Sequence, residues 1–91
     1  MDIGYYEEIQ GQLGGLLIRV DDPLPPTDLA LISEFIDHNE LGVALEQIVM
    51  VLADRSAAIS ADERADLLAL AARMGLGAEV ADDLARCRER T

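Results

Sequence analysis

The sequence contains no lysine and no tryptophan, one cysteine and only three aromatic residues. Seven arginines stand against eighteen acidic residues, which gives a net charge of −11. Affinity for nucleic acid depends on cations that neutralise phosphates, so direct nucleic-acid binding is excluded as a principal role. Anionic membrane surfaces are disfavoured for the same reason.

Cys87 is the single cysteine, so the chain cannot form an internal disulfide. A secreted domain of this size usually carries several cysteines. The N-terminal segment has neither the basic region nor the apolar region of a signal peptide. The longest apolar runs, 48–53 and 67–72, are far shorter than the ~20 residues that span a bilayer. These absences predict a cytoplasmic protein.

Apolar residues make up 51% of the chain and are mostly Leu, Ala, Ile and Val, which excludes a disordered protein. Leucine and alanine are strong helix formers, and no alternation typical of strands is visible. A chain of 91 residues suffices for one domain with a thin core. We therefore expect an all-α fold, in which residues 1–91 form a single compact bundle of four to five helices.

Apolar residues recur at helical spacing over residues 3–20 and predict a first helix. Gly11, Gly14 and Gly15 interrupt this pattern, and each costs up to ~1 kcal/mol in a helix interior. They indicate either a bent or broken helix or the close approach of another helix. The segment 21–26, with three prolines in four residues, ends this helix.

The next two helices are expected over 27–38 and 40–54. Thr27 is placed to cap the first of them, and Asn39 tolerates the left-handed conformation that ends a helix. The helix over 40–54 is apolar most of the way round. We therefore expect it to be the central and most buried element.

Ser60 and Glu63 form a capping-box pattern at the start of a fourth helix, which is expected to end at Met74. Gly75 then stands where a helix C-terminal glycine belongs. A last helix is expected over 78–89. Three arginines near its end suit the negative end of the helix dipole, namely Arg86, Arg88 and Arg90.

Few residues could carry catalysis or hold a metal ion. His38 and Cys87 are the only histidine and cysteine, and two residues far apart in the sequence do not supply a usual zinc site. Glu34 and His38 do not have the Glu-x-x-His spacing of di-iron bundles. The glycines of 11–15 lack the Lys-Ser/Thr of a phosphate-binding loop. We expect no catalytic, cofactor-binding or metal-binding residue, and hence no enzyme.

The excess of acidic over basic residues is concentrated in the first 54 residues. Residues 1–54 hold eleven acids and one base, Arg19, a net charge of −10, whereas residues 55–91 carry a net charge of −1. Acid that only keeps a small apolar protein soluble does not require this asymmetry. A surface that steers a cationic protein toward one side would use it.

The strongest candidates for such a surface lie in 34–46. Glu34 and Asp37 share a helical face, Glu40 follows beyond the turn, and Glu46 lies on the next helix. The alternative for this set is an ordinary solvated acidic face. Glu46 in particular can instead pair with Arg55 or another arginine within the fold.

The N-terminal segment Tyr5, Tyr6, Glu7 and Glu8 is the second candidate. Tyrosines are enriched at binding hot spots, and the neighbouring acids suit a cationic partner. The alternative is structural, with Tyr6 packed on the core and Tyr5 at its edge.

Three segments, taken in this order, carry a resemblance to a known family. They are HNELGVALEQI over 38–48, ISADE over 59–63 and LAARMGL over 70–76. Over about 28–76 the chain resembles the small helical immunity proteins of bacterial contact-dependent inhibition systems, the MafI-type group in particular. The resemblance implies a protein that binds the C-terminal toxin domain of an interbacterial-competition effector and blocks its active site. Such toxins are often nucleases and commonly basic, so a chain of charge −11 is complementary to them.

The expected toxin-binding residues are therefore Glu34, Asp37, Glu40, Glu46, Tyr5, Tyr6, Glu7 and Glu8. The free protein is expected to be a monomer or weak dimer. Two other functions fit the same pattern. One is an acidic adaptor or antitoxin that binds a basic regulator, and the other is a homo-oligomeric structural subunit that buries its apolar surplus between copies.

Overall fold

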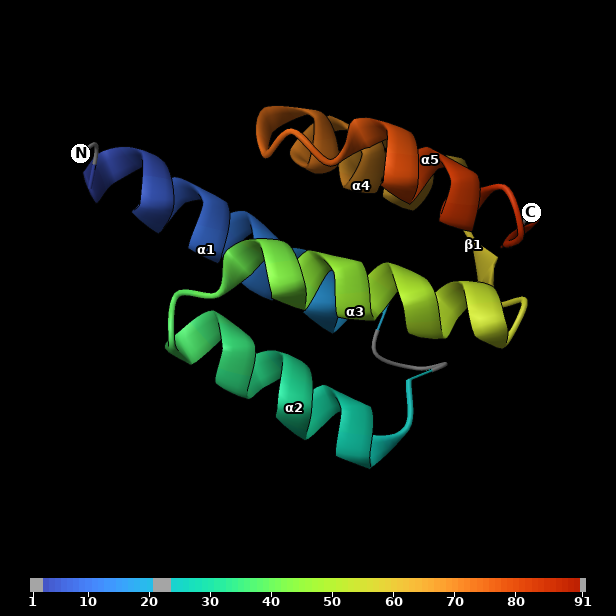
Figure 1. The fold of residues 1–91 in the computed structure, drawn as a ribbon. Helices are drawn as coiled ribbons and strands as arrows, with labels where there is room; N and C mark the ends of the chain where they lie inside the picture. The colour runs from blue at the N-terminus through green and yellow to red at the C-terminus, as the bar shows by residue number, and fades with distance from the viewer. Residues whose placement is uncertain (1–2, 21–23, 91) are drawn as a thin grey trace.

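The computed structural model describes residues 3–20 and 24–90, and within these ranges five helices pack around one core (Figure 1). This confirms the expected all-α bundle of four to five helices. None of the helices in the described ranges is both long and apolar enough to cross a bilayer. The elements are α1 (Ile3–Arg19), α2 (Pro26–Asp37), α3 (Leu41–Asp54), β1 (Ala58–Ile59), α4 (Ala61–Arg73), α5 (Gly77–Leu84) and β2 (Arg88–Glu89).

The third helix, α3, is the central element, as the sequence predicted. It contacts α1, α2 and α5, and Figure 1 shows it between α2 on one side and the α4–α5 pair on the other. Leu45, Ile48, Val49 and Leu52 of this helix are completely buried. Since most of the core is arranged around α3, the other helices take their positions from it.

The first helix, α1, runs without a break through its three glycines. A Cβ atom added at Gly11, Gly14 or Gly15 would meet nothing within 4 Å, so no neighbouring helix of the described chain approaches closely there. Ile9 and Leu13, on another face, are completely buried. The predicted break in the helix and the predicted close approach of another helix of the described chain are therefore both wrong.

The second helix begins at Pro26 rather than at Thr27, which lies exposed in its first turn. Thr27 is therefore not the predicted cap, and Pro25 occupies the N-cap position. Proline suits the first helical position because its missing N–H would have no partner there. Part of the predicted break over 21–26 falls outside the described residues. Asn39 has a φ of 60°, which confirms the predicted left-handed turn after α2.

The fourth helix has the predicted capping box. Ser60 Oγ accepts a hydrogen bond from the Glu63 backbone N–H at 3.0 Å, and the Ser60 N–H donates to Glu63 Oε1 at 2.9 Å. The second carboxylate oxygen of Glu63 accepts from Arg90 at 2.9 Å. Gly75, at a φ of 75°, follows this helix as predicted.

The last helix, α5, ends at Leu84, well before the predicted end at 89. The guanidinium of Arg64 donates to the backbone carbonyls of Leu84 and Cys87. After this point the tail leaves the helix, and its β2 pairs in parallel with β1 (Ala58–Ile59), before α4. The predicted dipole role of Arg86, Arg88 and Arg90 is therefore wrong, because Arg64 of α4 is the cation that binds the end of α5.

The buried Glu63, which is 4% exposed, has a pKa below its ordinary value. Burial acts to raise this pKa, but the hydrogen bond from the Ser60 N–H and the charge and hydrogen bond of Arg90 outweigh burial. Because the folded-state pKa is lower than the unfolded one, the carboxylate stabilises the fold above the unfolded value of 4.5. This contribution is lost as the pH falls through the folded value.

We expect Glu63→Gln to lower the free energy of unfolding by about 1–2 kcal/mol at pH 7, since the cap and the Arg90 pair are both weakened. The variant should also lose less stability than the parent on acidification to pH ~3, because the titrating group is gone. Urea unfolding at the two pH values measures both effects. The control is Asp62→Asn, since Asp62 is exposed in the same helical turn. Equal losses in the two variants would contradict the prediction.

Candidate protein-binding surface

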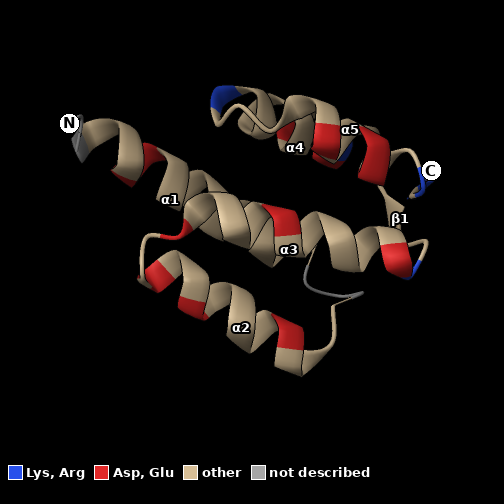
Figure 2. Ribbon diagram, in the orientation of Figure 1, with Lys and Arg blue, Asp and Glu red and all other residues tan. Residues whose placement is uncertain are grey.

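The first turns of α1 and the α2–α3 corner lie side by side. The side chain of Gln10 donates to the Ile36 carbonyl at 3.0 Å, and Tyr6 and Asn39 line the same hollow. Figure 2 shows the acidic residues of α1, of the end of α2 and of the following loop at one end of the molecule. We call this set the acidic end; it consists of Glu7, Glu8, Glu34, Asp37 and Glu40.

Most carboxylates of the acidic end are not neutralised by the fold. Glu7, Glu34, Asp37 and Glu40 are exposed, and no hydrogen bond or ion pair joins their side chains to other described residues. Glu8 differs, because its Oε1 lies 3.2 Å from Arg73 Nη1. The two segments that the sequence singled out separately therefore lie at one end of the molecule, and most of their carboxylates have no partner among the described residues.

The acids at the end of α2 stand where the helix dipole disfavours them. Glu34 and Asp37 occupy its last turn, which contains no basic residue. A negative charge at a helix C-terminus is typically unfavourable by about 0.3–1 kcal/mol. Lysine or arginine would stabilise α2 better at these positions. Stability of α2 therefore does not account for these acids.

Glu46 lies apart from the acidic end, on the outer face of α3. It is exposed, and the part of the chain that the structure describes gives it no ion pair with Arg55 or any other arginine. Val43 and Met50 lie one turn away on either side and are 46% and 42% exposed. This face of α3 therefore combines a free carboxylate with two apolar side chains that could be buried by a partner.

The positions of the two tyrosines are the reverse of the structural alternative, in which Tyr6 packs on the core and Tyr5 lies at its edge. Tyr5 packs against the core, its hydroxyl donates to the Arg73 carbonyl at 2.8 Å, and the Arg73 guanidinium lies 5.5 Å from its ring centroid. Tyr6 is 37% exposed, and the two rings form a T-shaped pair at 5.5 Å. The reason is that α4 lies on the side of α1 that carries Tyr5, Gln12 and Leu16. Tyr6 is therefore the tyrosine open to a partner.

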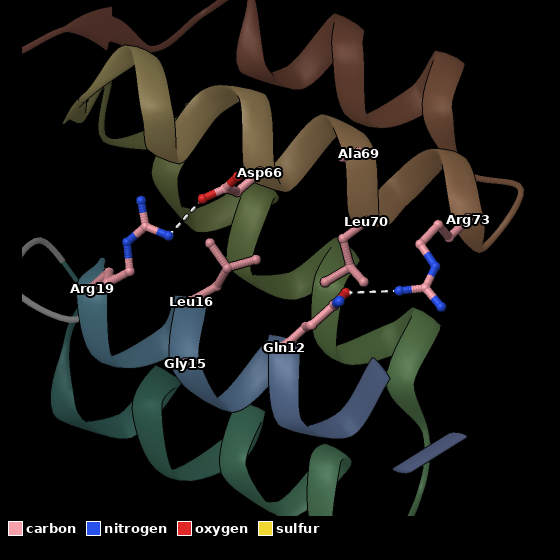
Figure 3. A pocket seen from close by; sticks show the side chains of 8 residues that line it. All are labelled: Gln12, Gly15, Leu16, Arg19, Asp66, Ala69, Leu70 and Arg73. Atoms are coloured by element: carbon pink, nitrogen blue, oxygen red, sulfur yellow. Dashed lines mark hydrogen bonds and ion pairs between the residues drawn. The ribbon is translucent and has the colours of Figure 1, made fainter. Parts of the chain in front are cut away.

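A groove of about 410 Å³ between α1 and α4 was not expected from the sequence. Figure 3 shows an arginine at each end of it: Arg19 bonds to Asp66 at 2.6 Å, and Arg73 bonds to Gln12 at 3.2 Å. Leu16 lies between these polar ends. The two walls come from helices far apart in the sequence, so no local pattern indicates this groove.

Almost every arginine of the described chain bonds to a carboxylate, a side-chain amide or a backbone carbonyl of the same chain. Arg19, the one base of residues 1–54, is neutralised by Asp66 of α4, and this hydrogen bond is the main reason that its pKa is raised. Arg55 is exposed without a partner among the described residues. The others bond to carboxylates or backbone carbonyls, namely Arg64, Arg73, Arg86, Arg88 and Arg90. The arginines therefore leave the acidic end largely unscreened.

Residues that could carry catalysis or hold a metal ion do not form a cluster in the described structure. Within residues 3–20 and 24–90 no group of three or more His, Cys, Asp or Glu side chains is arranged to hold a metal ion. His38 is exposed at the C-cap of α2. Cys87 is buried, and this burial raises the pKa of its thiol despite the nearby charges of Arg64 and Arg86. A buried thiol with a raised pKa is a poor nucleophile.

Comparison with known protein families, with curated proteins and with solved structures found no match to this chain. The case for a function therefore rests on the charge, exposure and contacts of its own residues. The features that bear on binding are the acidic end, the outer face of α3 and the two hollows beside α1.

Proposed function

We propose that this chain is an immunity protein that binds the basic toxin domain of a bacterial interbacterial-competition effector and neutralises it by occluding its active site. The observation that carries the proposal is the acidic end, whose carboxylates are exposed and mostly unpaired among the described residues. Charges of one sign repel one another when they are held together on rigid helices. A cationic partner relieves this repulsion, which gives the association a driving force.

The negative charge acts first on the rate of encounter. Residues 1–54 carry a net charge of −10, and attraction of this kind can raise association rates toward ~10⁸–10⁹ M⁻¹s⁻¹ at low salt. The screening length is only about 8 Å at physiological ionic strength. The association rate constant should therefore fall as salt is added, more steeply than the dissociation rate constant rises.

The exposed apolar side chains act after encounter. Rim charges contribute little to the lifetime of a complex, whereas apolar and aromatic side chains that become buried contribute much of it. Tyr6 is exposed on α1, and Val43 and Met50 are exposed on either side of Glu46 on α3, so these three side chains can take this role. This combination favours a binding surface over an acidic face that serves solubility alone.

The target is a toxin that cuts nucleic acid, because such a toxin must present cations to the phosphates of its substrate. The carboxylates of the acidic end take the place of those phosphates. The contacting residues are Glu34, Asp37, Glu40, Glu46, Tyr6, Glu7 and Glu8, whereas Tyr5 joins α1 to the end of α4. Inhibition is stoichiometric rather than enzymatic, requires no cofactor, and takes place in the cytoplasm by a protein that is a monomer or weak dimer when free.

Co-expression with the toxin domain encoded by the gene immediately upstream tests this proposal. The expected results are rescue of growth and co-purification of a one-to-one complex whose affinity falls with salt. Capture of a basic transcription regulator in place of a toxin would instead favour the adaptor function. A stable homodimer at micromolar concentration by light scattering, without affinity for the toxin domain, would favour a structural subunit and overturn the proposal.

A further inference from the structure

The outer face of α3 is formed by Val43, Glu46 and Met50, and its two apolar side chains lie two helical turns apart. Both are exposed, and Leu31 of the neighbouring α2 is 39% exposed. Three of the five large apolar side chains that are exposed among the described residues therefore belong to α2 and α3. In Figure 1 α1 passes behind α3, and no helix of the described chain lies in front of it. This apolar surface is therefore open to a partner.

A hydrogen bond between α2 and α3 shows which side chains border this face. The Gln47 amide donates to Asp28 Oδ1 at 3.4 Å. Figure 1 shows the two helices side by side and antiparallel. One turn from this bond toward the corner that joins them leads to Val43 on α3 and to Leu31 on α2. Leu31 and Val43 therefore stand at the same level on the two sides of the α2–α3 contact.

A carboxylate flanks the apolar stripe of α3 on each side. Successive residues of a helix lie about 100° apart around its axis, so Val43 and Met50 point between the directions of Glu46 and Gln47. Gln47 marks the side of α2, where its neutral amide holds the carboxylate of Asp28 without compensating the charge. Glu46 marks the other side and is exposed. No ion pair of the described residues includes either carboxylate.

We infer that the outer face of α3 docks an amphipathic helix of the partner protein, one whose apolar stripe has arginine or lysine on both sides. The apolar side chains of that helix cover Val43 and Met50, and its flanking cations pair with the carboxylates beside them. A helix fits because its own apolar residues recur at the two-turn spacing of the stripe on α3. The inference rests on the proposed function only for the identity of the protein that supplies this helix.

A second copy of this chain fits the same face less well. Two copies that met through α3 would bring the carboxylates of Asp28 and Glu46 in one chain toward the same carboxylates in the other. Each chain also carries a net charge of −11. Like charges brought together at an interface are costly, whereas a basic helix turns the same carboxylates into attractions. The charge pattern therefore favours a cationic partner over a second copy.

The docking site can be tested without the toxin, by adding a synthetic peptide of about 18 residues to the ¹⁵N-labelled chain and following the backbone amide shifts. The peptide carries a stripe of leucines at helical spacing with arginines on both sides of it. We expect saturable shifts centred on Leu31, Val43 and Met50. Binding should be several-fold weaker for a scrambled peptide of the same composition that lacks the stripe. A peptide with glutamates in place of the arginines should not bind.

Replacing Val43 and Met50 together by alanine should weaken binding of the striped peptide by about tenfold, because both apolar contacts are truncated. Alanine favours helix, so circular dichroism should show unchanged helicity. The matched control is Ile18→Ala, because Ile18 is 74% exposed on α1. Glu46→Gln should weaken binding by a factor of about three, with a smaller effect at high salt. Its matched control is Glu79→Gln, since Glu79 is exposed on α5.

Equal binding of the striped and scrambled peptides, or shifts centred on the acidic end, would overturn the docking site. Shifts on α3 that depend on the concentration of the chain itself, without peptide, would assign this face to a second copy and overturn the inference as well. Saturable binding of the striped peptide by a chain that captures no toxin would overturn the proposed function and leave the docking site standing. Capture of the toxin with an unchanged affinity for the double alanine variant would do the reverse.

Discussion

Replacing Glu34, Asp37 and Glu40 together by lysine is expected to weaken binding of the toxin domain by about 100-fold or more. Each substitution removes an attraction and adds a repulsion, and like charges brought together at an interface cost several kcal/mol. The loss should lie first in the association rate constant and should shrink as salt is raised. Stopped-flow or surface-binding kinetics at two salt concentrations measure both effects.

The same variant should fold as well as the parent or slightly better. All three side chains are exposed, and Glu34 and Asp37 occupy the last turn of α2, where a cation suits the helix dipole. Circular dichroism should therefore show unchanged helicity, with a thermal midpoint no lower than that of the parent. A loss of binding that accompanied unfolding would not support the acidic end as the interface.

The matched control reverses an equal number of exposed acids in the other half of the chain, namely Asp62, Glu79 and Asp82. This variant has the same net charge as the first. Asp62 and Glu79 lie in the first turns of α4 and α5, where lysine is less favourable, so its helicity is measured beside its binding. We expect it to lose less than tenfold in affinity. If both variants lose the same affinity, only net charge matters and the acidic end is not the contact surface.

Leu45→Ala is expected to lower the free energy of unfolding by about 3–4 kcal/mol, because a completely buried side chain at the centre of α3 leaves a cavity. A domain of this size has a stability of roughly 5–10 kcal/mol, so the variant should be largely unfolded well below the parent's melting temperature. Urea unfolding followed by circular dichroism measures the change.

Val43→Ala provides the comparison within the same helix, since Val43 is 46% exposed. Its truncation should cost less than about 1 kcal/mol, and it should weaken toxin binding instead. The two variants thus separate the buried face of α3 from its outer face. Similar losses of stability at Leu45 and Val43 would show that α3 is not the centre of the core.

Features of the fold that depend on neighbouring residues could be predicted from the sequence. The central position of α3, the capping box of Ser60 and Glu63, and the glycine at position 75 all follow from spacing, burial and local hydrogen bonding. The end of the last helix could not be predicted. Residues 85–89 are compatible with a helix, and it is the distant Arg64 and the backbone of β1 that draw them out of it.

The candidate site likewise has features that could be predicted from the sequence and features that depend on distant residues. The free carboxylates of Glu34, Asp37 and Glu40 could be anticipated, because an excess of acid over base in 1–54 leaves few internal partners. Which tyrosine faces outward could not, since this depends on where the end of α4 meets α1. Both hollows are formed by segments distant in sequence, and only the tertiary structure brings their walls together.

The bonds that Arg64 and Glu63 make in the C-terminal half have a consequence for how this protein can evolve. These residues tie the end of α5, the tail and the start of α4 together. The acidic end contributes little to that framework, so mutations at Glu34, Asp37 or Glu40 meet little purifying selection from folding. A lineage can therefore vary this surface while Ser60, Glu63 and Arg64 are retained.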